Sequence, residues 1–158
     1  MRVLLKFELP CTPNAAWRAI RSPSVFRAVS APFTTFTSVD PAGFPELWPA
    51  GEHRVDAKAF GALPIGEQAI AISFPERDDD VRTVIDSGRG LSGLLTAVTT
   101  WHHTMAISPI GVGRTLYRDE LRFTAGALTL PLWLMYWGFW QWRGLRIRQL
   151  ARRWRDAA

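Results

Sequence analysis

The chain has 158 residues, 47% of them hydrophobic, so it is long enough to bury a core and too apolar to be disordered by default. Its net charge of +5 lies at one end: residues 143–158 carry six Arg and one Asp, whereas the rest of the chain holds 13 basic and 13 acidic side chains. Cys11 is the only cysteine, which excludes a disulfide framework and a cysteine metal site, and we expect neither a metal nor a cofactor.

The N-terminal third predicts a strand followed by two short helices. In residues 2–9 apolar side chains occupy every second position, which is the pattern of a β-strand. A capping residue stands before a proline at 12–13 and again at 22–23, and each pair predicts the start of a helix. Residues 31–50 contain four prolines and little periodicity, so we expect a linking segment that could shelter an opening.

The middle of the chain predicts a series of strands. Apolar and β-branched segments alternate there with turns rich in Gly, Pro, Asp and Ser, and strands joined by short turns pair antiparallel. The expected strands are HRVDAKAF (53–60), GEQAIAISF (66–74), VRTVID (81–86), LTAVTTWHHTMAI (95–107) and RTLYRDELRF (114–123).

The C-terminal segment predicts the longest helix, at about 131–155. Pro131 suits the first helical position, and no second proline follows it. The apolar residues at positions 136, 140, 147, 150 and 154 recur at helical spacing, so they share one face, which needs a broad apolar partner. We therefore expect a single α+β domain spanning residues 1–158, with this helix laid against a sheet.

Two stretches resemble a signal peptide and a membrane span, but neither has the required sequence. Lys6 and Glu8 interrupt the first apolar run, so no signal peptide is predicted and a cytoplasmic protein is expected. The uncharged segment 125–142 contains Gly126 and Pro131, and the helix left after Pro131 would be only about 18 Å long against a ~30 Å bilayer core. Spanning is not expected, although contact with a membrane surface stays open.

The order of these elements, together with several local strings, resembles the START-like or SRPBCC superfamily, which includes the birch-pollen allergen and polyketide cyclases. The strings are TPNAAWRAI, GEHRVDAKAFGALPIGEQ, WHHTMAI and TLYRDELRF, and the resemblance covers essentially the whole chain. It implies a helix-grip fold, in which about seven antiparallel strands curve around the long C-terminal helix and two short helices follow strand 1. It also implies an internal cavity for an apolar or amphipathic molecule, without naming the ligand.

The hairpin around residues 108–113 carries the most informative polar pair. If Ile107 pairs with Thr115, then His103 stands opposite Asp119 on the inward face, with Cβ atoms about 5 Å apart. A carboxylate beside an imidazole fixes its tautomer and suits general acid–base catalysis, so His103 and Asp119 are the candidate catalytic residues. Two alternatives are a structural pair in the lining, and a one-residue slip that turns His102 inward.

Three functions fit these features. The favoured one is binding of a hydrophobic or amphipathic small molecule, lipid-like or polyketide-like, between the sheet and the last helix. The second is an enzyme of the polyketide cyclase, aromatase or dehydratase kind that uses the His–Asp pair. The third is a non-catalytic module whose Trp-rich segment, 132–142, contacts a membrane surface or a partner, including a second copy of the chain. The candidate ligand-binding residues are Trp48, Phe74, Trp101, His103, Met105, Tyr117, Asp119, Tyr136 and Trp140.

The charged segments are interpreted as solvated surface. The six arginines from position 143 to 155 accompany no nucleic-acid-binding motif, so they predict an exposed helix face and nucleic acid is not an expected partner. The acidic run Asp78–Asp80 lacks spaced ligands and predicts a solvated turn.

Overall fold

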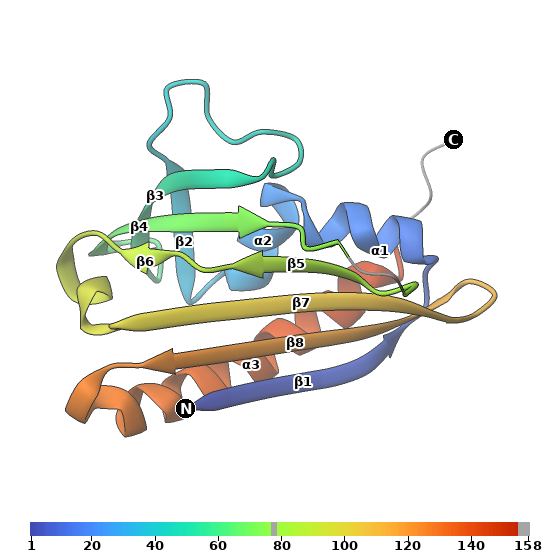
Figure 1. The fold of residues 1–158 in the computed structure, drawn as a ribbon. Coiled ribbons are helices and arrows are strands. Elements are labelled where there is room, and N and C mark those ends of the chain that lie inside the picture. The colour runs from blue at the N-terminus through green and yellow to red at the C-terminus, as the bar shows by residue number, and fades with distance from the viewer. Residues whose placement is uncertain (77–78, 155–158) are drawn as a thin grey trace.

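The structure is a computed structural model that describes residues 1–76 and 79–154 (Figure 1). Its strands are β1 (Arg2–Leu9), β2 (Thr34–Ser38), β3 (Gly51–Ala59), β4 (Leu63–Ser73), β5 (Arg82–Asp86), β6 (Arg89–Gly90), β7 (Thr100–Gly111) and β8 (Arg114–Thr124). Its helices are α1 (Pro13–Ile20), α2 (Pro23–Ser30) and α3 (Thr129–Ala151), with 3-10 turns η1 (Gly93–Ala97) and η2 (Gly126–Leu128).

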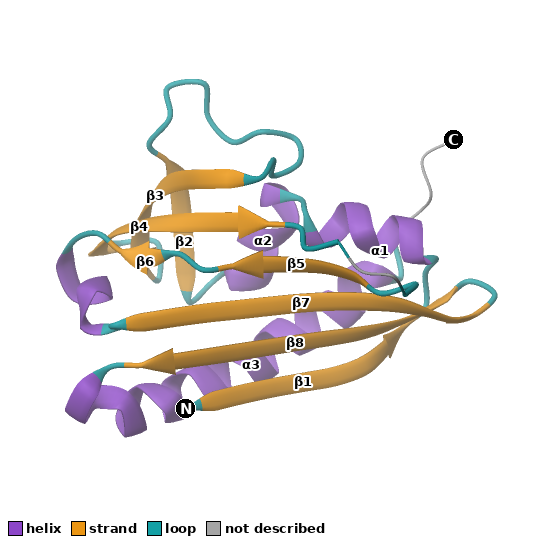
Figure 2. Cartoon of the chain, in the orientation of Figure 1, coloured by secondary structure: helices purple, strands orange, loops and turns teal. Residues whose placement is uncertain are grey.

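The strands form one curved antiparallel sheet. Within the described residues the order of hydrogen-bonded neighbours is β1-β8-β7-β5-β4-β3-β2, and β6 pairs with β4. The helix α3 crosses behind β8 and β1, and α1 and α2 lie near its C-terminal end (Figure 2). This arrangement confirms the expected α+β helix-grip fold.

The two short helices begin where the sequence predicts, whereas the long helix differs at both of its ends. The hydroxyl of Thr12 caps α1 by accepting a hydrogen bond from the Ala15 N–H at 3.2 Å. The long helix α3 begins at Thr129, two residues before Pro131, and ends at Ala151 rather than near 155. Its last turn tightens into i→i−3 hydrogen bonds, which end the regular helix early. Arg155, the predicted end, lies outside the described residues, as does part of the acidic run at 78–80.

Two segments in the middle of the chain differ from the prediction. Residues 34–38, expected within a linking segment, form β2 and pair with β3, because the prolines flank this short run and do not interrupt it. The predicted strand from Leu95 instead begins at Thr100. Gly93 has a φ of +62° and packs so closely on β4 that a Cβ there would lie 2.5 Å from the Ile65 carbonyl oxygen, so the chain turns into η1 at this point.

The register of the β7–β8 hairpin is shifted by two residues from the expected one. Ile107 lies opposite Tyr117 and not opposite Thr115, with an irregularity between Pro109 and Gly111. Because strand side chains alternate with a period of two, a two-residue shift keeps every side chain on its expected face. His103 is accordingly buried and His102 is exposed, which rules out the one-residue slip.

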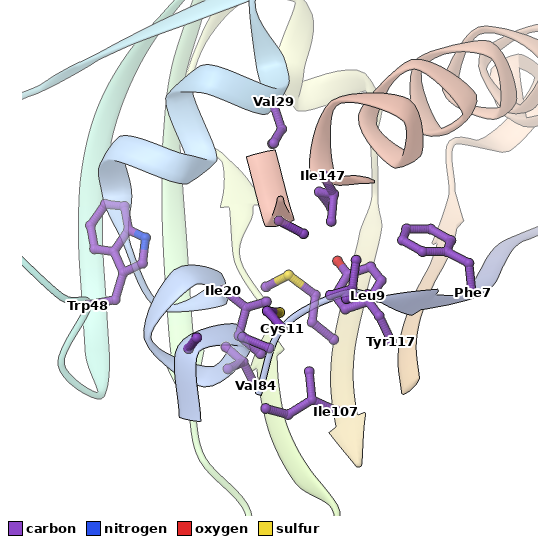
Figure 3. Packing of buried hydrophobic residues seen from close by; sticks show 14 of the residues in the cluster. Phe7, Leu9, Cys11, Ile20, Val29, Trp48, Val84, Ile107, Tyr117 and Ile147 are labelled. Carbon is purple, nitrogen blue, oxygen red and sulfur yellow. The ribbon is translucent and has the colours of Figure 1, made fainter. Parts of the chain in front are cut away.

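The core lies between the sheet and the helices. Figure 3 shows Ile147 of α3 and Val29 of α2 directed toward Tyr117 of β8 within this core. At Gly144, α3 comes so close to β1 that a Cβ would lie 3.0 Å from Leu5 Cδ1 and 3.4 Å from Phe7 Cε1. No helix in the described residues is long and apolar enough to cross a membrane.

We predict that Gly144→Leu destabilises the protein by about 1–3 kcal/mol, because the added side chain overpacks the contact between α3 and β1. Gly138→Leu is the matched control, since a Cβ there meets nothing within 4 Å. It is expected to stabilise the fold by up to about 1 kcal/mol through helix propensity. Urea unfolding of both variants measures the difference, and equal effects would contradict the close packing at Gly144.

Candidate functional site

A cavity of about 400 Å³ lies between the sheet and α3. Aromatic side chains supplied by α2, β2, β7 and α3 form much of its wall, chiefly Phe26, Phe36, Trp101, Tyr136 and Phe139. The Trp101 and Tyr136 rings meet edge to face, with their centroids 5.5 Å apart. A wall of this kind favours the apolar part of a small molecule.

The inner end of the cavity is polar. Asp86 at the end of β5, His103 on β7 and Arg143 on α3 reach this surface, and each is only 6 or 7% exposed. We call these three residues the polar floor. The same three residues border a smaller hollow of about 40 Å³ on the core side, whose lining includes Met105 and Tyr117. The polar floor therefore separates the cavity from the core.

The carboxylate of Asp119 lies beneath the polar floor and is fully buried. Its Oδ1 accepts hydrogen bonds from His103 Nε2 and Trp140 Nε1, each at 2.8 Å. Its Oδ2 accepts from the Tyr117 hydroxyl at 2.6 Å and from Arg143 Nε at 2.9 Å. Donors from β7, β8 and α3 thus converge on one side chain, which fills the acceptor capacity of a carboxylate.

The electrostatics of this cluster favour an ion pair. Burial alone raises the pKa of Asp119, but the charges of His103 and Arg143 and the hydrogen bonds outweigh it and hold the pKa well below its usual value. Burial lowers the pKa of Arg143, yet the Asp119 carboxylate more than offsets this and raises it. Burial and the same carboxylate raise the pKa of the Tyr117 hydroxyl. Asp119 and Arg143 are therefore both charged, and Tyr117 is a neutral donor.

Asp86 is a second buried carboxyl group with a different environment. Its Oδ1 accepts from the N–H groups of Ala71 and Gly88, each at 2.9 Å, and its Oδ2 accepts from Trp101 Nε1 at 3.1 Å. Burial raises its pKa, and the nearby His103 and the three hydrogen bonds only partly oppose this. Asp86 is thus the carboxyl group of the site that takes up a proton more readily than an ordinary aspartate.

The hydrogen bond to Asp119 also fixes the state of His103. An ionised carboxylate only accepts, so His103 Nε2 carries the proton. The second ring nitrogen, Nδ1, is not held by this hydrogen bond. Because His103 also lines the cavity, the cluster fixes the orientation of an imidazole at its inner end.

The structure divides the residues predicted as ligand-binding into three groups. Trp101, His103, Tyr136 and Trp140 line the cavity. Trp48, Met105 and Tyr117 border the smaller hollow and not the cavity, and Trp48 also lines a separate surface pocket beside Phe44. Asp119 lies behind the lining. Phe74 lines neither, because β4 ends at Ser73 and the Phe74 ring packs instead on Trp17, with centroids 5.7 Å apart.

Two residues of the polar floor are not among the predicted site residues. The sequence predicts an exposed helix face for Arg143, but this residue follows the inward-facing Trp140 by three positions and precedes the inward-facing Ile147 by four, so helical spacing places it inward. Asp86 shares a face with the buried Val84 two positions earlier. Within residues 1–76 and 79–154, no group of three His, Cys, Asp or Glu side chains could hold a metal ion.

We predict that Asp119→Asn destabilises the protein by about 3–5 kcal/mol, because it leaves the Arg143 guanidinium buried without its counter-charge. Glu120→Gln is the matched control: it is the next residue on β8, faces the other way, and pairs with Arg2 and Arg122 at the surface. A surface pair of this kind contributes under about 1 kcal/mol. Chemical denaturation measures both, and equal losses would contradict the buried ion pair.

Comparison of wild type with Asp119→Asn also tests how the free energy of unfolding depends on pH. Since the folded pKa of Asp119 is lowered, its stabilisation is fully present above its ordinary pKa near ~4 and is lost as the pH falls further. The stability difference between wild type and Asp119→Asn should therefore shrink below about pH 4. Asp86, whose folded pKa is raised, changes the stability with pH in the opposite direction. Because Asp86 is present in both proteins, its contribution cancels in the stability difference.

Comparison with known proteins gives matches at the level of structure. No protein-family model and no curated protein matches the chain. Norcoclaurine synthase from Thalictrum flavum, solved with dopamine and hydroxybenzaldehyde, has a TM-score of 0.64 at 12% identity over 99% of this chain and 89% of its own. A protein from Mesorhizobium loti gives 0.64 at 15% identity, over 99% and 100% of the two chains. A hypothetical protein from Helicobacter pylori gives 0.67 at 10% identity, over 96% and 88%. Likeness at these identities shows the fold alone, and the helix-grip fold is the one that the sequence led us to expect.

Proposed function

We propose that this protein binds a hydrophobic or amphipathic small molecule in the cavity between the sheet and α3. The observation that carries the proposal is the cavity of about 400 Å³ with aromatic walls and a polar inner end. Burial of apolar ligand surface supplies about 25 cal/mol per Å² before the costs of ordering are subtracted. Solved neighbours of this fold support the proposal, because norcoclaurine synthase holds small aromatic molecules.

The position of the charges indicates how such a ligand lies. The polar floor closes the inner end, and exposed apolar side chains such as Phe60 and Met135 stand at the outer part of the same lining. A molecule with one polar end would place that end at Asp86, His103 and Arg143 and its apolar body along the aromatic wall. The ligand class proposed is therefore amphipathic, lipid-like or polyketide-like.

Catalysis by the same site is a second candidate, and the orientation of His103 favours it. Asp119 accepts four hydrogen bonds from the described residues and stays ionised, so it can position the imidazole but cannot carry a proton itself. The groups able to exchange protons with a ligand are His103 Nδ1 and Asp86, whose pKa is raised. In an enzyme of the cyclase or dehydratase kind, these two residues would act and Asp119 would support them.

We predict that Ala59→Trp weakens ligand binding at least tenfold, about 1.4 kcal/mol, because Ala59 lines the cavity and a Trp there fills it. Lys58→Trp is the matched control, since Lys58 is the neighbouring residue on β3 and faces solvent. Native mass spectrometry of co-purifying ligand, and titration with 1-anilinonaphthalene-8-sulfonate, measure both. Binding that neither variant changes would contradict the cavity as the site.

The two candidate functions are separated by His103→Gln. Its side-chain amide can still donate to Asp119 Oδ1 but cannot accept a proton, so the cluster is kept while the base is removed. A binding protein should keep its ligand affinity within a few-fold. An enzyme should keep affinity and lose turnover of a polyketide-like substrate by about 10²–10⁴-fold. Loss of both would mean that His103→Gln damages the site itself. Comparing its chemical-denaturation curve with those of the wild type and of Asp119→Asn shows whether the hydrogen bonds to Asp119 are lost.

A further inference from the structure

The side of α3 that faces away from the sheet carries an unusual run of exposed apolar residues. Leu130, Leu134, Trp137 and Leu145 are 57, 59, 50 and 46% exposed. Their spacing places them on one side of the helix, with the exposed Gln141 between Trp137 and Leu145. We call these four residues the apolar stripe. Contiguous exposed apolar surface is uncommon on a monomeric protein and marks a contact surface.

The other tryptophans of this helix are already engaged. Trp133 Nε1 donates to the Arg2 carbonyl oxygen at 2.9 Å, and Trp142 Nε1 donates to the Ala31 carbonyl oxygen at 2.8 Å. The Trp142 ring also packs on Phe33, with centroids 5.5 Å apart. Trp137 has no such partner within residues 1–76 and 79–154, so it is the aromatic residue of the helix that is left for an external contact.

The charge of α3 is arranged along its length. From Thr129 to Ala151 there is no Asp or Glu, and no Arg or Lys precedes position 143. Arg143 pairs with Asp119. Arg148, about one turn beyond Leu145, is exposed and holds its guanidinium over the Phe7 ring, 4.0 Å from the centroid, and the exposed Arg153 follows. The exposed side is thus apolar in its first half and basic in its second. Such a surface complements apolar chains flanked by negative head groups.

The apolar stripe continues into the rim of the cavity. Met135 is adjacent to Leu134, is 55% exposed, and also lines the cavity. Three more side chains are both exposed and part of the cavity lining: Phe33 before β2, Phe60 after β3 and Leu94 in η1. The exposed apolar surface is therefore larger than the helix alone provides.

From these observations we propose that the apolar stripe and the adjoining rim dock on an anionic phospholipid bilayer. The apolar half of α3 lies among the acyl-chain boundary, and the arginines that follow it contact the lipid phosphates. In this arrangement α3 lies parallel to the membrane surface. The proposal concerns the outer surface and stands whether or not the cavity holds a ligand.

A second copy of the chain fits this surface less well. In a two-fold pair whose antiparallel α3 helices overlap along their whole length, the apolar half of each helix would face the arginines of the other. A pair that overlaps only over the apolar halves would leave the arginines without a role in the contact. In a parallel pair the arginines would face one another, which costs free energy through like-charge repulsion. An anionic bilayer offers acyl chains to the apolar half of α3 and phosphates to the arginines, and this favours the bilayer as the occupant.

The test is co-sedimentation of the full chain with vesicles of phosphatidylcholine, with and without phosphatidylglycerol. Binding to the anionic vesicles should exceed binding to the neutral ones and should fall in high salt. The double variant Leu134→Glu/Trp137→Glu should bind them at least about tenfold more weakly, since two apolar anchors are lost and two negative charges added. Val112→Glu is the matched control, because Val112 is fully exposed at the β7–β8 turn, at the far end of the hairpin from the start of α3 (Figure 1).

Three results would overturn the proposal: no binding by the wild type, equal weakening by the double variant and the control, or a stable dimer that the double variant dissociates. Unfolding curves of all three proteins establish that the double variant is folded. Titration with 1-anilinonaphthalene-8-sulfonate in the absence of vesicles, repeated with Ala59→Trp, reports on the cavity through the part of the dye signal that this variant removes. Failure of docking with normal dye binding is thereby distinguished from failure of the proposed ligand-binding function.

Discussion

The carboxylate of Asp119 is the constraint on which the site depends. It is fully buried and joins β8 to β7 through His103 and to α3 through Trp140 and Arg143. A buried charge that loses a partner costs several kcal/mol, so the rotation and the axial position of α3 over the sheet are fixed by this contact rather than by apolar packing alone. Apolar packing tolerates small shifts of a helix, whereas hydrogen bonds at 2.6–2.9 Å do not.

This constraint also explains why a cavity can persist beside a packed core. The charged and polar groups that surround Asp119 cannot collapse into the apolar space next to them without losing their hydrogen bonds. The aromatic residues on the far side of the polar floor are held by the sheet and by α3. The space between the two sets is therefore left open, and its inner end presents Asp86, His103 and Arg143 together.

Much of this arrangement could be predicted from the sequence, because it depends on periodicity. The alternation of apolar residues in 114–123 places Tyr117 and Asp119 inward, and the contact with His103 forms even though the register differs by two residues, since that shift preserves the face. The partner of Arg143 could not be predicted: helical spacing places the side chain inward, but the residue it meets depends on how the helix is laid on the sheet. Likewise η1 takes the place of the first residues of the strand predicted at 95–107, because the contact between Gly93 and β4 overrides the β-branched residues around it.

The helix α3 remains unusual even after the site is explained. A helix that is apolar all round is normally buried all round, and a helix covering one face of a sheet needs only an inward stripe. Here Trp140, Arg143 and Ile147 form the buried inward side, which packs on the sheet and contributes to the site. The fold does not require Leu134 and Trp137 to be apolar, because polar residues at these exposed positions would leave the core unchanged. Their hydrophobicity, followed along the same side by arginines, is therefore a property of the surface, and it is the property on which the proposed contact with an anionic bilayer depends.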